Sequence, residues 1–169
     1  MYNNCINCVS IPGNRPAAQA NIRGSVEYPD LNGTISFYQT TQGVLVSAEI
    51  YGLPDSMSPC QHPVFGFHIH NGESCTGNDT DPFADALTHY NPTNCPHPYH
   101  AGDLPPLFGN DGYAFMMFLT NRFTVREVIG KTIIVHDMPD DFTTQPAGNS
   151  GNKIGCGVIV GTRNSFASK

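Results

Sequence analysis

The segment GVLVSAEIY at residues 43–51 is rich in β-branched and aromatic side chains and alternates like a strand with one buried face. Segments of the same kind, separated by turn signals, lie at residues 21–28, 34–40, 64–70, 113–120, 131–137 and 154–160. The segments up to residue 70 are predicted to form four strands of a meander. Asn32-Gly33 predicts a hairpin turn between the first two, because both positions tolerate positive φ.

The composition agrees with an all-β protein. The chain of 169 residues fits one domain with a real hydrophobic core. Only 13% of the residues are charged, and 17 glycines and 14 prolines favour short strands joined by many turns. We therefore expect an arm at residues 1–18 and a single folded domain at residues 19–169.

The charge pattern argues against some partners. A formal net charge of −6, with no cluster of Lys or Arg, disfavours nucleic acid and anionic membrane surfaces, so a small ligand or an ion is the expected partner. No apolar run approaches the roughly 20 residues that span a bilayer, and the first residues do not resemble a secretion signal. The compartment stays open between the cytoplasm and a mature secreted form.

Two long irregular stretches interrupt the strand pattern, one of about thirty residues after Asn71 and one at residues 138–152. Loops of this length in a compact domain usually carry function. The six cysteines are Cys5, Cys8, Cys60, Cys75, Cys95 and Cys156, a number compatible with disulfides, metal binding or both. The Cys5-x-x-Cys8 pair is open between copper binding, redox exchange and a disulfide, and Cys60 is a candidate partner for Cys95.

Six of the seven histidines fall in three places: a strand, the first long loop and the end of a later strand. His68 and His70 lie two apart on a predicted strand, so both imidazoles point to the same face. His97, His100 and Asp103 follow one another at intervals of three in the loop, and His89 precedes them.

These residues form two candidate ligand sets. Three imidazoles and a carboxylate from His89, His97, His100 and Asp103 suit tetrahedral zinc. Four imidazoles from His68, His70, His89 and His136 suit copper, which prefers nitrogen ligands in tetragonal geometry. His89 belongs to both sets, which requires one metal at each ring nitrogen.

At this point the sequence resembles a known family. The segments GFHIHNGESC (66–75), HYNPTNCPHPYHAGDLPPL (89–107), GKTIIVHDMPDD (130–141) and GNSGNKIGCGVIV (148–160) closely resemble copper,zinc superoxide dismutases. The resemblance runs in order through roughly residues 20–162. It implies an eight-stranded Greek-key β-barrel or flattened sandwich with two long functional loops.

The resemblance also implies the chemistry. It assigns copper to His68, His70, His89 and His136, zinc to His89, His97, His100 and Asp103, and the reaction to superoxide as the substrate. Asp140 would hydrogen-bond His68 and His97, and Cys75 would pair with Cys156. His89 would deliver a proton as its bond to copper breaks, and family members are often homodimers.

Two positions depart from the family pattern. Lys153 stands where the family usually has an arginine at the mouth of the copper channel, and Ala147 replaces the usual threonine. Lysine lacks the planar guanidinium group with which arginine orients an anion, so we expect superoxide to dock in a less well defined orientation. The alternative to a dismutase is therefore a copper-binding or copper-delivery protein of the same fold with little activity, and a purely structural domain is the third possibility.

Overall fold

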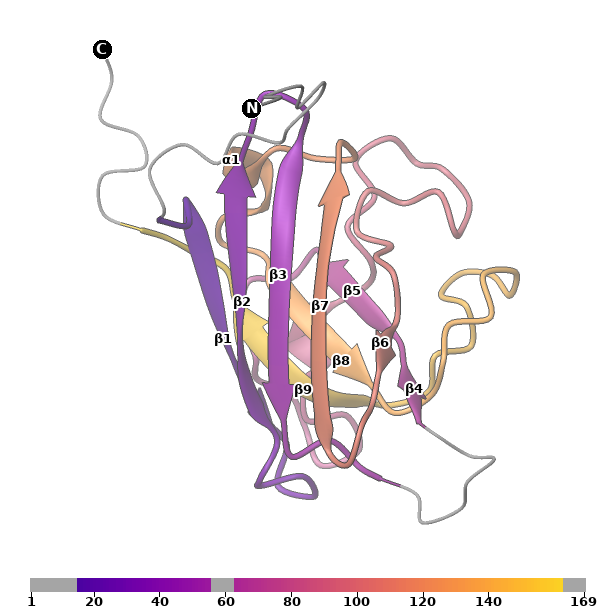
Figure 1. Cartoon of the computed structure of the whole chain (residues 1–169). Helices are drawn as coiled ribbons and strands as arrows, with labels where there is room; N and C mark the ends of the chain where they lie inside the picture. Colours follow the sequence, from indigo (N-terminus) through magenta and orange to yellow (C-terminus); the bar gives the residue numbers. More distant parts are fainter. Residues whose placement is uncertain (1–14, 56–62, 163–169) are drawn as a thin grey trace.

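The computed structural model describes residues 15–55 and 63–162 (Figure 1). In chain order, the strands are β1 (Ala18–Gly24), β2 (Asn32–Gln39), β3 (Val44–Tyr51), β4 (Val64–Phe65), β5 (Phe67–His70), β6 (Leu107–Phe108), β7 (Tyr113–Thr120), β8 (Thr132–His136), β9 (Lys153–Val158) and β10 (Val160–Gly161). A 3-10 turn, η2 (Ala84–Ala86), and one α-helical turn, α1 (Val125–Val128), lie in connections. The predicted all-β class is confirmed.

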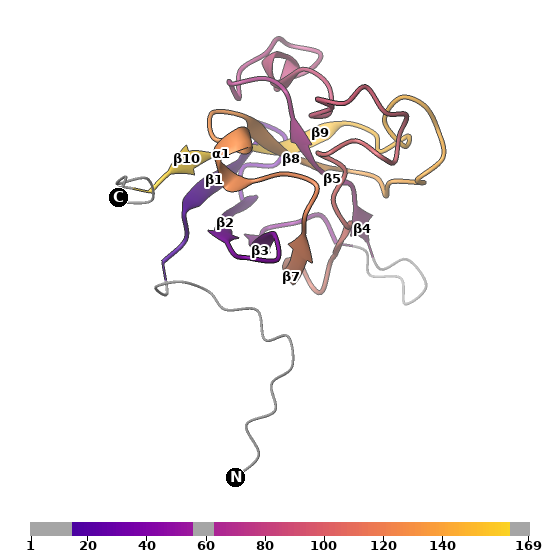
Figure 2. The same ribbon diagram turned by 90° about the horizontal axis from the view of Figure 1, so that it is seen from above.

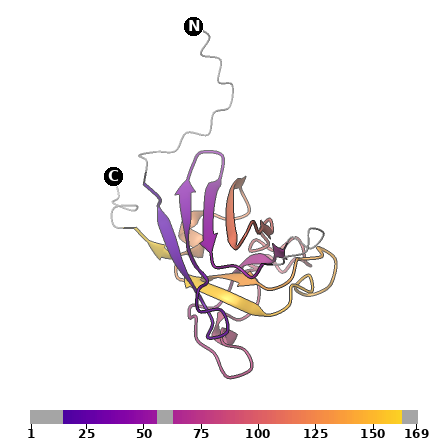
Figure 3. The same ribbon diagram turned by 60° about the horizontal axis from the view of Figure 1, so that its bottom comes forward.

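Eight of these strands form one curled antiparallel sheet in the order β5-β8-β9-β1-β2-β3-β7, with β10 also paired to β1, and β4 and β6 form a separate two-stranded sheet. Seen from above, β1, β2, β3 and β7 make one wall and β5, β8 and β9 make the other (Figure 2). Figure 3 shows β9, in yellow, beside β1, in indigo, where the sheet passes from one wall to the other. This arrangement agrees with the predicted Greek-key barrel.

The strand predicted at residues 43–51 is confirmed as β3. Its inward residues, Val44, Val46, Ala48 and Ile50, are fully buried, while the intervening side chains are only partly buried. The alternation therefore reflects one face on the core and one toward solvent.

The hairpin turn predicted at Asn32-Gly33 is wrong. Both residues lie within β2, where Gly33 pairs with Ile22 on one side and Ile50 on the other. The connection instead spans residues 25–31 and is closed by a hydrogen bond from Gly24 N to Leu31 O at 2.8 Å. Gly33 serves close strand approach, since a Cβ there would lie 2.3 Å from Glu49 O.

The predicted four-strand meander is also wrong in its last member. β1, β2 and β3 follow one another, but the fourth segment splits into β4, which pairs with β6, and β5, which pairs with β8. The neighbour of β3 is β7. The chain leaves the first wall after β3, and this crossover carries β5 into the opposite wall, where both of its faces are covered.

The core fills the space between the walls, with Phe37, Phe67, Ile69 and Ile133 among its fully buried side chains. β5 and β8 are buried at every position. The two long loops emerge beside these strands. Within residues 15–55 and 63–162, no helix is long and apolar enough to cross a membrane.

Candidate metal centre

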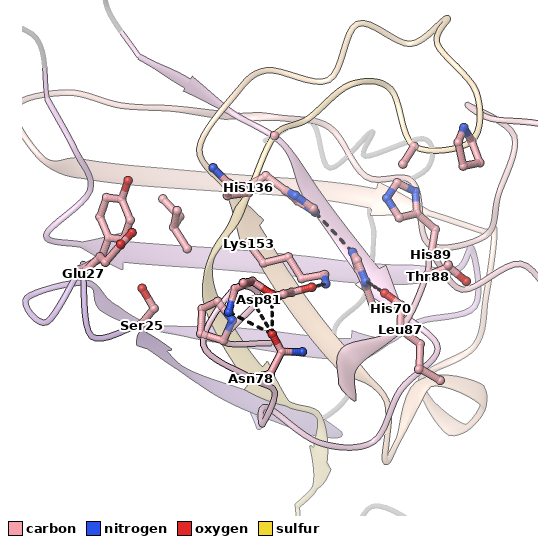
Figure 4. Close-up of a pocket in the computed structure, with 18 of the residues that line it drawn as sticks. Ser25, Glu27, His70, Asn78, Asp81, Leu87, Thr88, His89, His136 and Lys153 are labelled. Carbon is pink, nitrogen blue, oxygen red and sulfur yellow. Dashed lines mark hydrogen bonds and ion pairs between the residues drawn. The ribbon is translucent and has the colours of Figure 1, made fainter. Parts of the chain in front are cut away.

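Strand β5 presents two imidazoles on one face. His68 and His70 alternate with Phe67 and Ile69, which belong to the core, and all four residues are buried. His136 ends the neighbouring strand β8, and its Nε2 lies 3.3 Å from Nε2 of His70 (Figure 4). The sheet thus brings together histidines that are 66 residues apart.

The first long loop runs back along β5. Tyr90 N donates to Ile69 O at 2.8 Å, and isolated bridges pair His70 with His89 and His68 with Asp103. Each histidine of β5 therefore has one loop ligand candidate directly beside it. Backbone pairing thus places the loop residues beside the histidines of the strand.

Two groups of side chains result, and every member is buried. The four-histidine group comprises His68, His70, His89 and His136. The Asp103 group comprises His89, His97, His100 and Asp103. Within each group the candidate ligand atoms all lie within 4.8 Å of one another, and His89 belongs to both.

The two nitrogens of His89 face different groups. Nδ1 lies 2.7 Å from Oδ1 of Asp103, whereas Nε2 is buried without a hydrogen-bond partner. An unsatisfied buried nitrogen is costly unless something binds it. The ring of His89 is therefore placed to serve both groups at once.

Asp103 is the centre of its group. Its carboxylate lies 3.1 Å from Nδ1 of His97, without hydrogen-bond geometry, and 3.2 Å from Nδ1 of His100. Burial raises the pKa of Asp103, but the hydrogen bond with His89 and the nearby imidazoles outweigh it, so its pKa lies below the usual value. The carboxylate is thus anionic at neutral pH.

Asp140 connects the two groups by hydrogen bonds to one histidine of each. Its Oδ2 lies 2.7 Å from Nε2 of His68, and its Oδ1 lies 2.9 Å from Nε2 of His97 and also accepts from Phe142 N. Burial raises its pKa, yet these hydrogen bonds dominate and hold it at about 2. An ionised Asp140 fixes both Nε2 atoms as donors and leaves both Nδ1 atoms as ligand atoms.

Burial keeps three of the histidines, His68, His70 and His136, neutral. Burial lowers the pKa of His68 to about 4, despite the hydrogen bond to Asp140, which raises it. Burial, with the neighbouring histidines adding to it, lowers the pKa values of His70 and His136 well below the usual value. His70 donates from Nδ1 to Leu87 O at 2.8 Å, so in the neutral ring Nε2 carries the lone pair that can bind a metal.

These donor sets fit the predicted metals. A group of four imidazoles suits copper, and three imidazoles with one carboxylate suit tetrahedral zinc. The unsatisfied Nδ1 of His68 and Nε2 of His89 are the lone pairs that a metal would occupy. The structure therefore brings together all seven predicted ligand residues.

Three members of the four-histidine group, His70, His89 and His136, line a pocket of about 950 Å³ whose wall also includes Lys153 and Ala147. Lys153 is the first residue of β9 and the cross-strand partner of His136. A disulfide joins Cys75, in the first long loop, to Cys156 of the same strand. Strand β9 thus fixes both the cation and the loop at the edge of the pocket.

Sequence reasoning missed two residues of this region. Nη1 of Arg122 donates to the carbonyl oxygens of Pro98, His100 and Asp103 at 3.0, 3.1 and 3.0 Å, and so holds the chain around the Asp103 group. Asp81 forms an ion pair with Lys153. Neither belongs to a motif or a regular spacing, so no local signal marks them.

Two cysteine predictions, the Cys5-x-x-Cys8 pair and the pairing of Cys60 with Cys95, involve residues that the structure does not describe. Cys5, Cys8 and Cys60 lie outside the described residues. Cys95 makes no disulfide with any cysteine in the described ranges.

Comparisons with known proteins agree with this geometry. The family model described as copper/zinc superoxide dismutase matches residues 31–159. A Cu-Zn superoxide dismutase of Deinococcus radiodurans is 36% identical over 147 residues, covering 76% of this chain and 77% of that protein. The superoxide dismutase-like protein YojM of Bacillus subtilis is 34% identical over 111 residues, covering 57% of this chain and 55% of that protein.

Among solved structures, a double mutant of a SOD-like protein from Bacillus subtilis matches with a TM-score of 0.68 and 27% identity. The match covers 85% of this chain and 97% of that one.

Proposed function

The chain belongs to the copper/zinc superoxide dismutase family, and on this premise we propose that it is a superoxide dismutase. The reaction converts two superoxide anions and two protons into dioxygen and hydrogen peroxide. The observation that carries the proposal is the buried ring of His89, shared between the four-histidine group and the Asp103 group. This shared imidazole is the proposed proton donor, and it lies directly at the proposed redox site.

We assign copper to the four-histidine group and zinc to the Asp103 group. When bound, copper would supply the one-electron redox chemistry of both half-reactions, and zinc would be held by His89, His97, His100 and Asp103. Asp140 contacts one histidine that belongs only to the four-histidine group and one that belongs only to the Asp103 group, so it keeps both rings in a binding orientation.

Nε2 of His89 is the proposed site of the transferred proton. It is buried and has no other hydrogen-bond partner, so a proton held there is available to the reacting oxygen species. Nδ1 stays engaged on the side of Asp103, which keeps the ring in place while Nε2 gains and loses the proton.

Lys153 is the proposed anion-docking residue. It lines the pocket beside His136, and its ammonium group can attract and position superoxide. Ala147 offers no hydroxyl to assist it. Docking therefore depends on the charge of Lys153 rather than on a directed set of hydrogen bonds.

The test is superoxide removal by protein reconstituted with equimolar copper and zinc. We expect catalytic removal that collapses in His136→Ala and persists in Met138→Ala, an exposed neighbour that serves as the matched control. Both variants are loaded and analysed for metal in the same way. Removal by the wild type that is no faster than by His136→Ala overturns the dismutase assignment.

A second candidate is a copper-binding or copper-delivery protein. Two observations favour it: Lys153 is already paired with Asp81, and the comparisons include proteins described only as superoxide dismutase-like. This candidate predicts tight copper binding, transfer of copper to a competing chelator or acceptor protein, and negligible turnover of superoxide.

A further inference from the structure

The charge of Lys153 is positioned at the entrance to the four-histidine group. The residue begins β9 opposite His136, and its side chain is only 15% exposed. Figure 4 shows it extending across the pocket to the carboxylate of Asp81, below the His70–His136 pair. The ammonium group of Lys153 is therefore paired with the carboxylate of Asp81 and does not present an unpaired positive charge to the pocket.

Asp81 is held in place by its own loop. One carboxylate oxygen forms the ion pair with Nζ of Lys153, and the other accepts from Phe83 N at 3.0 Å. The Asn78 side chain in turn accepts from Thr80 N and Asp81 N, both at 3.0 Å. The carboxylate is therefore fixed before it meets the lysine, and little side-chain entropy is lost in pairing.

A disulfide links the loop that carries Asp81 to the strand that carries Lys153. Cys75 lies six residues before Asp81 in the same loop, and Cys156 lies three residues after Lys153 on β9. The bond anchors the loop to the strand at a point close in sequence to both partners. The ion pair is consequently a built feature of the pocket rather than a chance contact between two mobile surface groups.

Within the part of the chain that the structure describes, the rest of the pocket wall supplies no other Lys or Arg charge to replace that of Lys153. Besides Asp81, the wall contains Glu27 and Asp79, and Lys153 is its one Lys or Arg side chain among the described residues. The pocket volume of about 950 Å³ is far larger than a diatomic anion, so size does not limit entry. Charge is left as the property that decides which small ligands enter.

We propose that Asp81 is a specificity-determining residue that neutralises Lys153 and so lowers the affinity of the pocket for small anions. This inference rests on the proposed function, because it concerns access of an anionic substrate to the same site. In this view the pocket contains a potential anion-binding site that the Asp81 carboxylate blocks. Removing that carboxylate would leave Lys153 in place with an unpaired positive charge.

The experiment measures azide binding to copper- and zinc-loaded protein by the absorption change of Cu(II), which requires no turnover. Asp81→Asn is expected to tighten azide binding by about threefold or more, since it frees a partly buried cation. The matched control is Asp79→Asn, which removes an equal charge from the same loop without freeing Lys153 and is expected to change binding by less than about 1.5-fold. Asp81→Ser, which keeps an oxygen acceptor for Phe83 N, repeats the test should the asparagine variant fold poorly.

The double variant identifies Lys153 as the mediator. In a Lys153→Gln background, Asp81→Asn is expected to act no more strongly than Asp79→Asn, because no cation remains to be freed. The proposal is overturned by an Asp81→Asn effect no larger than that of Asp79→Asn, or by an effect that persists undiminished with Lys153→Gln.

The same variants separate this inference from the proposed function. A tighter azide complex in Asp81→Asn, with no catalytic superoxide removal in any variant, overturns the dismutase assignment and keeps the role of Asp81. Catalytic superoxide removal with an azide affinity that is unchanged in Asp81→Asn keeps the dismutase assignment and overturns the role of Asp81. Where both hold, the second-order rate constant for superoxide should rise in Asp81→Asn.

Discussion

Oδ2 of Asp140 lies 2.7 Å from Nε2 of His68, and this single carboxylate connects the four-histidine group to the Asp103 group through its second contact at His97. The residue belongs to the second long loop, whereas both histidines belong to other parts of the chain. Its ionised oxygens determine which nitrogen of each ring is free. The orientation of two candidate ligands therefore depends on one side chain that belongs to neither group.

Asp140→Asn should weaken the binding of both metals. The carboxylate offers one oxygen to each ring, whereas an amide has only one oxygen, so whichever way the amide is turned one imidazole N–H group loses its acceptor. With either ring left unoriented in this way, we expect affinities roughly 10- to 100-fold lower. Competition with chromophoric chelators measures the dissociation constants. Asp141→Asn, at an exposed neighbouring position, should leave them unchanged, and equal losses in both variants would contradict the role given to Asp140.

Arg122→Ala should lower the affinity for zinc more than that for copper. The variant removes the three hydrogen bonds to the carbonyls around His100 and Asp103, so the ligand loop is less ordered before binding, and we expect about a tenfold loss. Arg126→Ala, on α1, is the matched control for loss of a guanidinium. A zinc affinity unchanged by Arg122→Ala would show that the loop holds its shape without these bonds.

The metal-free protein should lose stability as pH falls from about 6.5 towards 4. The pKa of His68 is about 4 when folded and near 6.5 when unfolded, so the unfolded chain binds the extra proton in this interval. His70 and His136 shift in the same direction. At pH 5 the loss from His68 alone is about 2 kcal/mol.

Urea unfolding of the metal-free, disulfide-intact protein at pH 7, 6 and 5 checks this sign. Asp140, with a folded pKa of about 2, still stabilises throughout this window and does not offset the loss. A free energy of unfolding that stays constant or rises between pH 7 and pH 5 would rule out neutral, buried histidines in the folded apoprotein.

Replacing Cys75 and Cys156 by serine should destabilise the fold. The bond closes a segment with a sequence separation of 81, for which chain entropy gives roughly 4–5 kcal/mol. Cys95→Ser, at a cysteine without a disulfide in the described structure, is the control. Denaturant midpoints compared at equal metal content give the difference, and equal midpoints for the two variants would contradict a stabilising role.

Rising ionic strength should not slow the proposed reaction. The net charge of −6 and the pairing of Lys153 with Asp81 leave no long-range attraction for an anion, so salt screens repulsion rather than steering. Pulse radiolysis between about 10 and 200 mM salt tests this, since the Debye length falls from about 30 to below 10 Å. A rate constant that falls more than twofold over this range would indicate effective steering.

The sequence by itself determined the all-β class, the position of β3 and the shared face of His68 and His70. These features depend on the two-residue period of a strand, which local sequence displays directly. The double membership of His89 also follows from counting nitrogen donors against two metal sites. Order along the chain and donor chemistry were enough for each of these predictions.

Only the tertiary structure decided which segments meet. Gly33 looked like a turn residue, but its lack of a Cβ serves the close approach of Glu49 O from the neighbouring strand. Asp81 and Lys153 are 72 residues apart and meet only because the loop and β9 are packed and bonded together. Long-range pairing depends on how the walls of the barrel close, and no local period in the sequence records that.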